Sequence, residues 1–140
     1  SSGKISTFIG RSDRNRKKMM VFSDEKYKSK EAITHWKVLK KNDENNITLI
    51  ECNLETGRTH QIRVHLDHIS HPVLGDPLYG NGYKTRINKL RSTIKILVEK
   101  HGNTQALHAY KLGFEHPITN ENLIFETDPP ETMKKIIESF

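Results

Sequence analysis

The fold is decided by residues 54–70, which read LETGRTHQIRVHLDHIS. A strand-like stretch ends at Leu54, and a turn centred on Gly57 follows it. After the turn the apolar residues recur at positions i, i+4 and i+7, which is the period of a helix and not of a strand. These residues are Ile62, Leu66 and Ile69. The pattern predicts a helix of about three turns with Thr59 as its N-cap.

Working outward from this helix, strand-like stretches lie on both sides of it. Upstream there is weak alternation or apolar composition over 4–9, 19–22, 32–39 and 47–54. An Asn/Asp-rich turn at 42–46 predicts a hairpin between the last two. Downstream we predict a helix over 87–98, strands over 106–114 and 122–127, and a last helix with Asp128 as N-cap and proline in its first turn. Together they predict an α+β fold, with a mixed, mainly antiparallel sheet and flanking helices.

The composition favours a nucleic-acid partner. The chain has 140 residues, 23 Lys and Arg against 17 Asp and Glu, and a net charge of +6. Five basic residues fall within eight positions, and this loop is either a solvated polar loop or a contact for an RNA backbone. They are Arg11, Arg14, Arg16, Lys17 and Lys18.

Cysteine usage and hydropathy bear on the cellular compartment. The single cysteine, Cys52, excludes an internal disulfide and favours a reducing compartment, so we expect a cytoplasmic protein. No apolar run reaches the ~18 residues that a membrane span requires, and we expect no membrane association.

Charged side chains gather at the start of the predicted helix. His60, Arg63 and Asp67 share one helical face, and Arg58 lies beside the N-terminus. Because a helix N-terminus favours negative charge, the site suits an anion, either a nucleotide phosphate or a carboxylate from elsewhere in the fold. The alternative is an ordinary surface pair between Arg63 and Asp67 at i and i+4.

Four histidines within twelve residues suggest a metal site as another alternative. They are His60, His65, His68 and His71. No His-Glu-x-x-His pattern accompanies them, and Cys52 lies eight residues upstream of His60. We therefore expect no metal and rank a metal-dependent hydrolase last. Capping, packing and RNA contact are the expected uses of these imidazoles.

Residues 54–65 and 71–80, the latter reading HPVLGDPLYG, resemble the third conserved motif of the RluA-type RNA pseudouridine synthases. Residues 105–109 and 116–118 resemble the strands that follow this motif in the family. Residues 9–11, the basic loop and residues 34–38 resemble the stretch that precedes it. The resemblance covers nearly the whole chain and is closest to the enzymes that modify large-subunit ribosomal RNA.

This resemblance implies an isomerisation of uridine to pseudouridine in RNA without any cofactor. An aspartate attacks the target uridine after the base is flipped out of its stack. Arg63 is expected to pair with that aspartate, which would lower the carboxylate pKa by ~1–3 units. Leu54 is expected to line the uracil pocket, and Arg58 and His60 to contact phosphate or support the turn. The expected partner is RNA, specifically ribosomal RNA.

One part of the family pattern is absent. The nucleophilic aspartate belongs to a His-Arg-Leu-Asp segment, which does not occur in this sequence. We therefore expect residues 1–140 to be the C-terminal portion of a single catalytic domain and to be inactive alone. The alternative is a non-catalytic RNA-binding module derived from the same fold.

Overall fold

A computed structural model describes residues 1–25, 28–102 and 104–140. Strands come first along the chain, helices follow, and a hairpin and a helix close it. In chain order the elements are β1 (Ser2–Arg11), β2 (Met19–Phe22), β3 (Lys30–Asn42), β4 (Ile47–Leu54), α1 (Gln61–His68), α2 (Tyr83–Asn88), α3 (Ser92–His101), β5 (Lys111–Glu115), β6 (Asn122–Glu126) and α4 (Glu131–Glu138).

The first four strands form an antiparallel sheet in the order β2-β1-β3-β4. Ile9 lies opposite Val21 in the β1–β2 pair, and Thr34 lies opposite Leu54 in the β3–β4 hairpin that the sequence predicts. Side chains alternate between the two faces along β1 and β3, and the buried ones from both strands lie on one face of the sheet. These are Ile5, Ile9, Ala32 and Thr34. The predicted α+β class with a mainly antiparallel sheet and flanking helices is confirmed.

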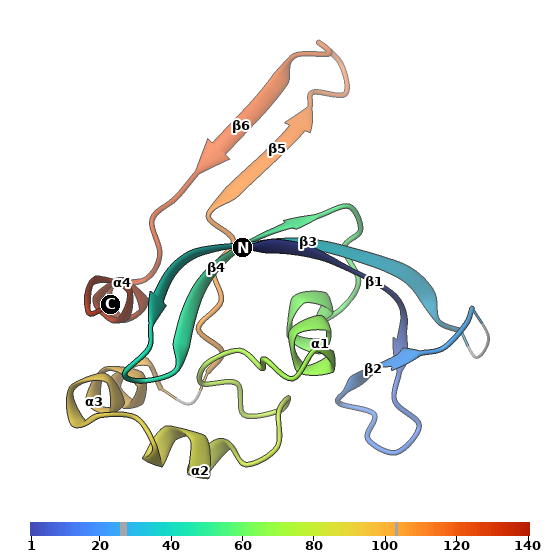
Figure 1. The fold of residues 1–140 in the computed structure, drawn as a ribbon. Helices are drawn as coiled ribbons and strands as arrows, with labels where there is room; N and C mark the ends of the chain where they lie inside the picture. The colour runs from blue at the N-terminus through green and yellow to red at the C-terminus, as the bar shows by residue number, and fades with distance from the viewer. Residues whose placement is uncertain (26–27, 103) are drawn as a thin grey trace.

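Helix α1 lies below the curved sheet in Figure 1 and joins the core at two places. Val64 packs in a cluster with Ile9, Ala32 and Tyr79. Two residues along the helix, Leu66 packs in a second cluster with two more apolar residues, Ile5 and Val73. Burial of both side chains fixes α1 against the sheet, and this helix carries Arg63 and Asp67.

The predicted helix over 87–98 is wrong in one respect, since the structure divides it into α2 and α3. Arg91 is extended at this break, with φ −64° and ψ 151°, and its N–H donates to Asn45 Oδ1 at 2.8 Å. The break thereby ties both helices to the β3–β4 turn. Their apolar faces share one cluster with α4, which consists of Ile87, Leu90, Ile94, Val98 and Ile136.

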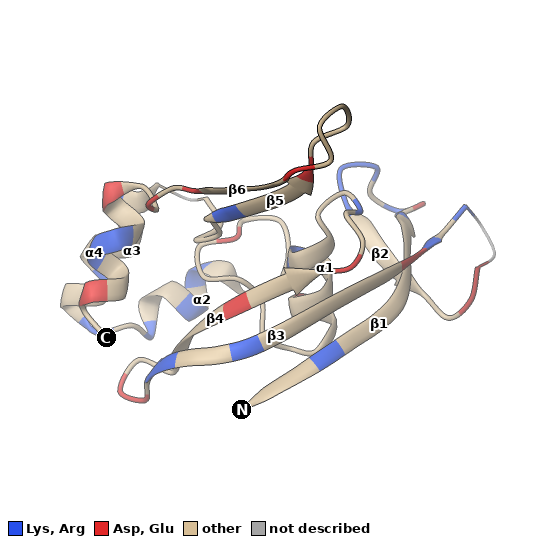
Figure 2. Cartoon of the chain, turned by 90° about the horizontal axis from the view of Figure 1, so that it is seen from above, with Lys and Arg blue, Asp and Glu red and all other residues tan. Residues whose placement is uncertain are grey.

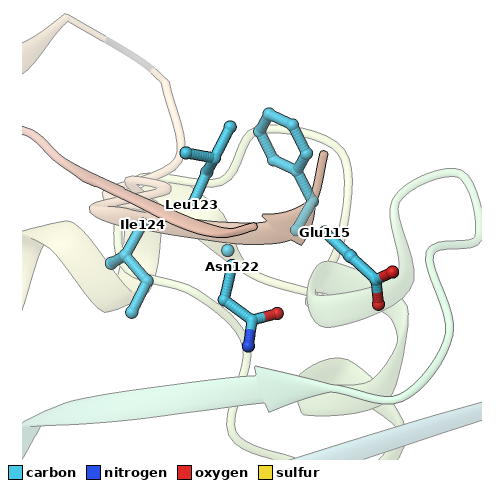
Figure 3. Close-up of a pocket in the computed structure, with 6 residues that line it drawn as sticks. Glu115, Asn122, Leu123 and Ile124 are labelled. Atoms are coloured by element: carbon cyan, nitrogen blue, oxygen red, sulfur yellow. The ribbon is translucent and has the colours of Figure 1, made fainter. Parts of the chain in front are cut away.

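The β5–β6 hairpin extends upward from the sheet in Figure 1. Its strands pair antiparallel, with Leu112 opposite Phe125, and confirm the two predicted strands in shorter form. A cavity of about 390 Å³ lies on the hairpin. Leu123 points to one face there, and Asn122 and Ile124 to the other (Figure 3).

The last helix begins later than the sequence predicts. Its N-cap is Pro130 and not Asp128, and α4 starts at Glu131. Proline fixes φ near −65°, so the two prolines hold an extended entry to the helix and move its first turn downstream. Among the described residues no helix is long and apolar enough to cross a membrane.

Candidate functional site

The turn between β4 and α1 is held by the side chain of Gln61. Its amide nitrogen donates to the carbonyl oxygen of Ile33 and to Thr34 Oγ1, both at 3.0 Å. Its amide oxygen accepts from Thr56 Oγ1 at 2.8 Å and from the N–H of Arg58 at 2.9 Å. Because Gln61 is buried and fully bonded, it fixes the start of α1 to strand β3.

The prediction that Thr59 caps the helix is wrong. The N-cap is His60 in the left-handed region, with φ 55° and ψ 21°, and no side chain bonds to the free N–H groups there. The helix is also shorter than predicted, with eight residues. Gln61 instead fixes the turn before the helix, by accepting the N–H of Arg58, a contact that sequence spacing alone did not suggest.

His60 is joined to a buried tyrosine. Its Nδ1 lies 2.8 Å from the hydroxyl oxygen of Tyr79, which also accepts the N–H of Met19 at 2.8 Å. When the imidazole is neutral with its proton on Nε2, the Tyr79 hydroxyl donates to His60 Nδ1. Burial, followed by the charge of Arg63, lowers the pKa of His60 and favours that neutral form.

Arg63 forms a bidentate ion pair with Asp76. Its Nε and Nη2 donate to the two carboxylate oxygens at 2.7 and 2.8 Å. The Asp76 side chain is 0% exposed and that of Arg63 is 10% exposed. The alternative of a surface pair with Asp67 is wrong, since Arg63 bonds to Asp76. The expected pairing of Arg63 with the nucleophilic aspartate stays a prediction. Within the described ranges, Nη1 has no hydrogen-bond partner.

The loop that carries Asp76 is also fixed. Asp76 Oδ1 accepts the N–H groups of Leu78 and Tyr79 at 2.9 and 3.1 Å. Burial alone would raise the pKa of Asp76, but the hydrogen bonds from Arg63 and from these two amides outweigh it and lower the pKa. Gly75 just before it has φ +77°, and a Cβ there would lie 2.4 Å from the carbonyl oxygen of Thr104. Only glycine fits this turn.

Tyr79 connects the Arg63 pair to the basic loop. The Arg63 guanidinium carbon lies 4.9 Å from the centroid of the Tyr79 ring, and Lys18 Nζ lies 5.3 Å from the same centroid. The ring is 1% exposed. Two cations that are far apart in the sequence therefore contact one buried ring.

The basic loop joins β1 to β2, and its Lys and Arg residues are blue in Figure 2. Arg11 Nη1 donates to the carbonyl oxygen of Arg16 at 2.8 Å and holds the base of the loop. Arg14 and Lys18 line a cleft of about 800 Å³, whose other walls are β2, α1 and Tyr79. Arg16 and Lys17 are exposed on the loop but do not line this cleft.

Two further predicted site residues flank the turn. Leu54 ends β4 with 43% of its surface exposed. Arg58 Nε donates to the carbonyl oxygen of Glu31 at 2.8 Å, so part of its guanidinium is used to hold the turn against β3.

The histidines do not converge on a metal. Across residues 1–25, 28–102 and 104–140 no group of three or more metal-binding side chains is found. His65 is fully buried instead, with Nδ1 and Nε2 each 2.8 Å from a threonine hydroxyl, those of Thr34 and Thr7. Burial lowers its pKa to about 4. His65 is thus a neutral link between α1 and two strands.

The profile described as RNA pseudouridylate synthase matches residues 1–68. Ribosomal large subunit pseudouridine synthase D of Neisseria meningitidis serogroup A is 45% identical over 135 residues, which is 96% of this chain and 34% of that protein. This chain belongs to the RNA pseudouridylate synthase family. An uncharacterized RNA pseudouridine synthase of Bacillus subtilis is 44% identical, over 98% of the chain and 38% of its own length.

Solved structures agree with this family assignment. Human RNA Pseudouridylate Synthase Domain Containing 1 superposes with a TM-score of 0.66 at 26% identity, over 93% of this chain and 49% of that chain. Human RNA Pseudouridylate Synthase Domain Containing 4 has a TM-score of 0.68 at 21% identity, which shows a shared fold. The chain spans about a third of the length of the Neisseria relatives that it matches.

Three residues that organise this site were missed by the sequence interpretation. They are Gln61, Asp76 and Tyr79. All three lie inside the stretches that resemble the family motif, and this location could have marked them as candidate site residues. Their partners were not predictable, because the contact between Arg63 and Asp76 spans thirteen residues and depends on the loop conformation at Gly75.

Proposed function

We propose that residues 1–140 form the C-terminal portion of a catalytic domain that isomerises uridine to pseudouridine in RNA, with large-subunit ribosomal RNA as the substrate. The observation that carries this proposal is the Arg63–Asp76 pair. Two guanidinium nitrogens are held by a buried carboxylate, so the third has a fixed position before any substrate binds. The 45% identity to the Neisseria enzyme over 96% of the chain supports the same reaction.

In this proposal Nη1 of Arg63 pairs with the nucleophilic aspartate, which a part of the synthase outside this chain supplies. A cation held at that place keeps the aspartate ionised and oriented toward the flipped base. Leu54, exposed at the end of β4, contacts the uracil ring. No cofactor is required, because the isomerisation moves a base that the enzyme already holds.

The remaining proposed contacts are to the RNA backbone. Phosphates meet the cations of the basic loop and the polar side chains of the turn before α1, where a neutral His60 can donate a hydrogen bond. These residues are Arg11, Arg14, Arg16, Lys17, Lys18, Arg58 and His60. A reducing cytoplasmic location fits the single cysteine, Cys52, which is free.

The proposal is tested by tritium release from RNA that carries 5-tritiated uridine. In the full-length protein, Arg63→Lys keeps the charge but loses the two-pronged contact with Asp76, and we expect turnover to fall by about 10²-fold or more. Arg91→Lys is the matched control, since Arg91 is exposed in a surface pair with Glu44, and turnover should be unchanged.

The same assay tests the 140-residue chain alone, from which we expect background release. Release above background from this chain would contradict the placement of the nucleophile outside it. Unchanged turnover in Arg63→Lys would contradict the role of Arg63. A full-length protein that binds RNA but releases no tritium would favour the non-catalytic RNA-binding module.

A further inference from the structure

Leu54 is the last residue of β4, and the turn that follows it stays against strand β3. Ile33 of β3 meets this turn with both of its backbone groups. Its N–H donates to Thr56 Oγ1 at 2.9 Å. Its carbonyl oxygen accepts the N–H of Glu55 at 3.2 Å and Nε2 of Gln61 at 3.0 Å. Two of these bonds involve side chains of Thr56 and Gln61, so the place of the turn depends on those side chains as well as on the backbone.

The Gln61 side chain joins three parts of the proposed site. Gln61 is the first residue of α1, the helix that carries Arg63. Its amide nitrogen donates to β3, and its amide oxygen accepts from Thr56 Oγ1 and from the N–H of Arg58 in the turn. Gln61 is only 3% exposed, so water does not compete for these bonds. One buried amide therefore holds the strand, the turn and the helix together.

These partners allow one orientation of the amide. A backbone N–H can only donate and a carbonyl oxygen can only accept. The amide oxygen of Gln61 must therefore face the N–H of Arg58, and its nitrogen must face the carbonyl oxygen of Ile33. An apolar side chain of similar length would fill the same space but would leave these groups without their partner.

A row of buried side chains supports the amide from the other side. Thr34 Oγ1 accepts Nε2 of Gln61 at 3.0 Å and lies 2.8 Å from Nδ1 of His65. Nε2 of His65 lies 2.8 Å from Thr7 Oγ1 on β1. When His65 is neutral with its proton on Nε2, Thr34 donates to Nδ1 and Nε2 donates to Thr7. The row thus runs from β1 to the amide of Gln61.

We propose that Gln61 is a positioning residue for the isomerisation, because it holds Leu54 at a fixed separation from Arg63, with Thr34 keeping the amide in place. This inference rests on the proposed function, which gives Leu54 and Arg63 their roles. Arg63 has a separate anchor in Asp76. Loss of the Gln61 amide therefore moves Leu54 relative to Arg63 and misorients the target base, whereas the phosphate contacts of the basic loop remain.

Tritium release by the full-length protein, measured against RNA concentration, separates kcat from KM. Gln61→Met fills the same space without the hydrogen bonds, and we expect kcat to fall about tenfold or more because the base is misoriented. KM should change by less than about threefold, since phosphate contacts dominate affinity for RNA.

Two threonine variants form a matched pair, because each loses one bond to His65. Thr34→Val also removes an acceptor of the Gln61 amide, and kcat should fall roughly fivefold, as for the loss of one hydrogen bond. Thr34→Ser keeps the hydroxyl and should restore kcat. Thr7→Val is the control, since Thr7 lies at the β1 end of the row, and its kcat should be unchanged. This pair decides the question if Gln61→Met does not fold.

Three results would overturn the inference. They are a kcat of Gln61→Met close to that of the unchanged protein, a change in that variant confined to KM, and equal kcat values for Thr34→Val and Thr7→Val. The second would assign Gln61 to RNA binding, and the third would leave the row a structural role alone. Arg63→Lys is assayed beside these variants. If it alone lowers kcat, the proposed function stands and this inference fails.

Discussion

Helix α1 and the β5–β6 hairpin are fixed in very different ways. Buried residues of α1 include three polar side chains, and each has partners in the sheet or in the loop after the helix; they are Gln61, Arg63 and His65. In the hairpin every residue of β5 is exposed, and in β6 only Leu123 is half-buried. Helix α1 is held by polar contacts with residues distant in sequence, whereas the hairpin is held mainly by the pairing of its own two strands.

The difference fits the role that we propose for Arg63. A guanidinium that acts on a reacting carboxylate must be held within a fraction of an ångström, and bonded neighbours would provide that. A two-stranded hairpin is only marginally stable by itself. Just before β5, the hydroxyl of Tyr110 donates to the carboxylate of Glu51 on β4 and links this end of the hairpin to the four-stranded sheet.

The largest loss of stability is expected when the carboxylate that holds Arg63 is removed. Asp76→Ala should lower the free energy of unfolding by about 3–5 kcal/mol, because it leaves a buried cation without a partner. Urea-induced unfolding measures the change. Glu44→Ala is the control, since it breaks an exposed ion pair with Arg91, and it should cost less than about 1 kcal/mol. Similar losses in both variants would contradict the importance of the buried pair.

A smaller effect is expected from acid. The fold lowers the pKa of His65 from 6.5 to about 4, so the unfolded chain binds more protons than the folded chain between these values. Stability should therefore fall as the pH decreases from 6.5 to 4, by up to about 3 kcal/mol, and level off below. His60 shifts in the same direction, whereas Asp76 loses its contribution only below its ordinary pKa of 3.8.

Urea unfolding at pH 7 and pH 4.5 measures this dependence. In His65→Gln the glutamine can still bond to the threonine hydroxyls but cannot titrate, so the difference between the two pH values should shrink. An undiminished difference would assign the acid sensitivity to other groups.

The smallest effect is expected in the hairpin. Leu112 is 62% exposed, and Leu112→Ser should change the free energy of unfolding by less than about 0.5 kcal/mol. The comparison is Val64→Ser on α1, which should be strongly destabilising because Val64 is buried among Ile9, Ala32 and Tyr79. A large loss from Leu112→Ser would show that the hairpin is covered in solution.

Apolar periodicity was sufficient for the main elements. It predicted the strand that ends at Leu54, the helix that carries Arg63 and the hairpin of β3 and β4, all of which the structure contains. Helix ends were predicted less well. Thr59 and Asp128 have favourable cap residue types, but the left-handed conformation of His60 at the start of α1 and the entry to α4 through Pro130 depend on backbone angles that residue type does not give.

The sequence by itself determined the fold class, the family and the place of Arg63 on a helix after a glycine turn, because these depend on local period and on a long motif. Only the tertiary structure decided what Arg63 contacts. Asp76 reaches it through a loop whose shape depends on the left-handed turn at Gly75, and Tyr79 brings Lys18 to the same place. Such contacts arise from the packing of segments that are distant in sequence, and local patterns carry no information about them.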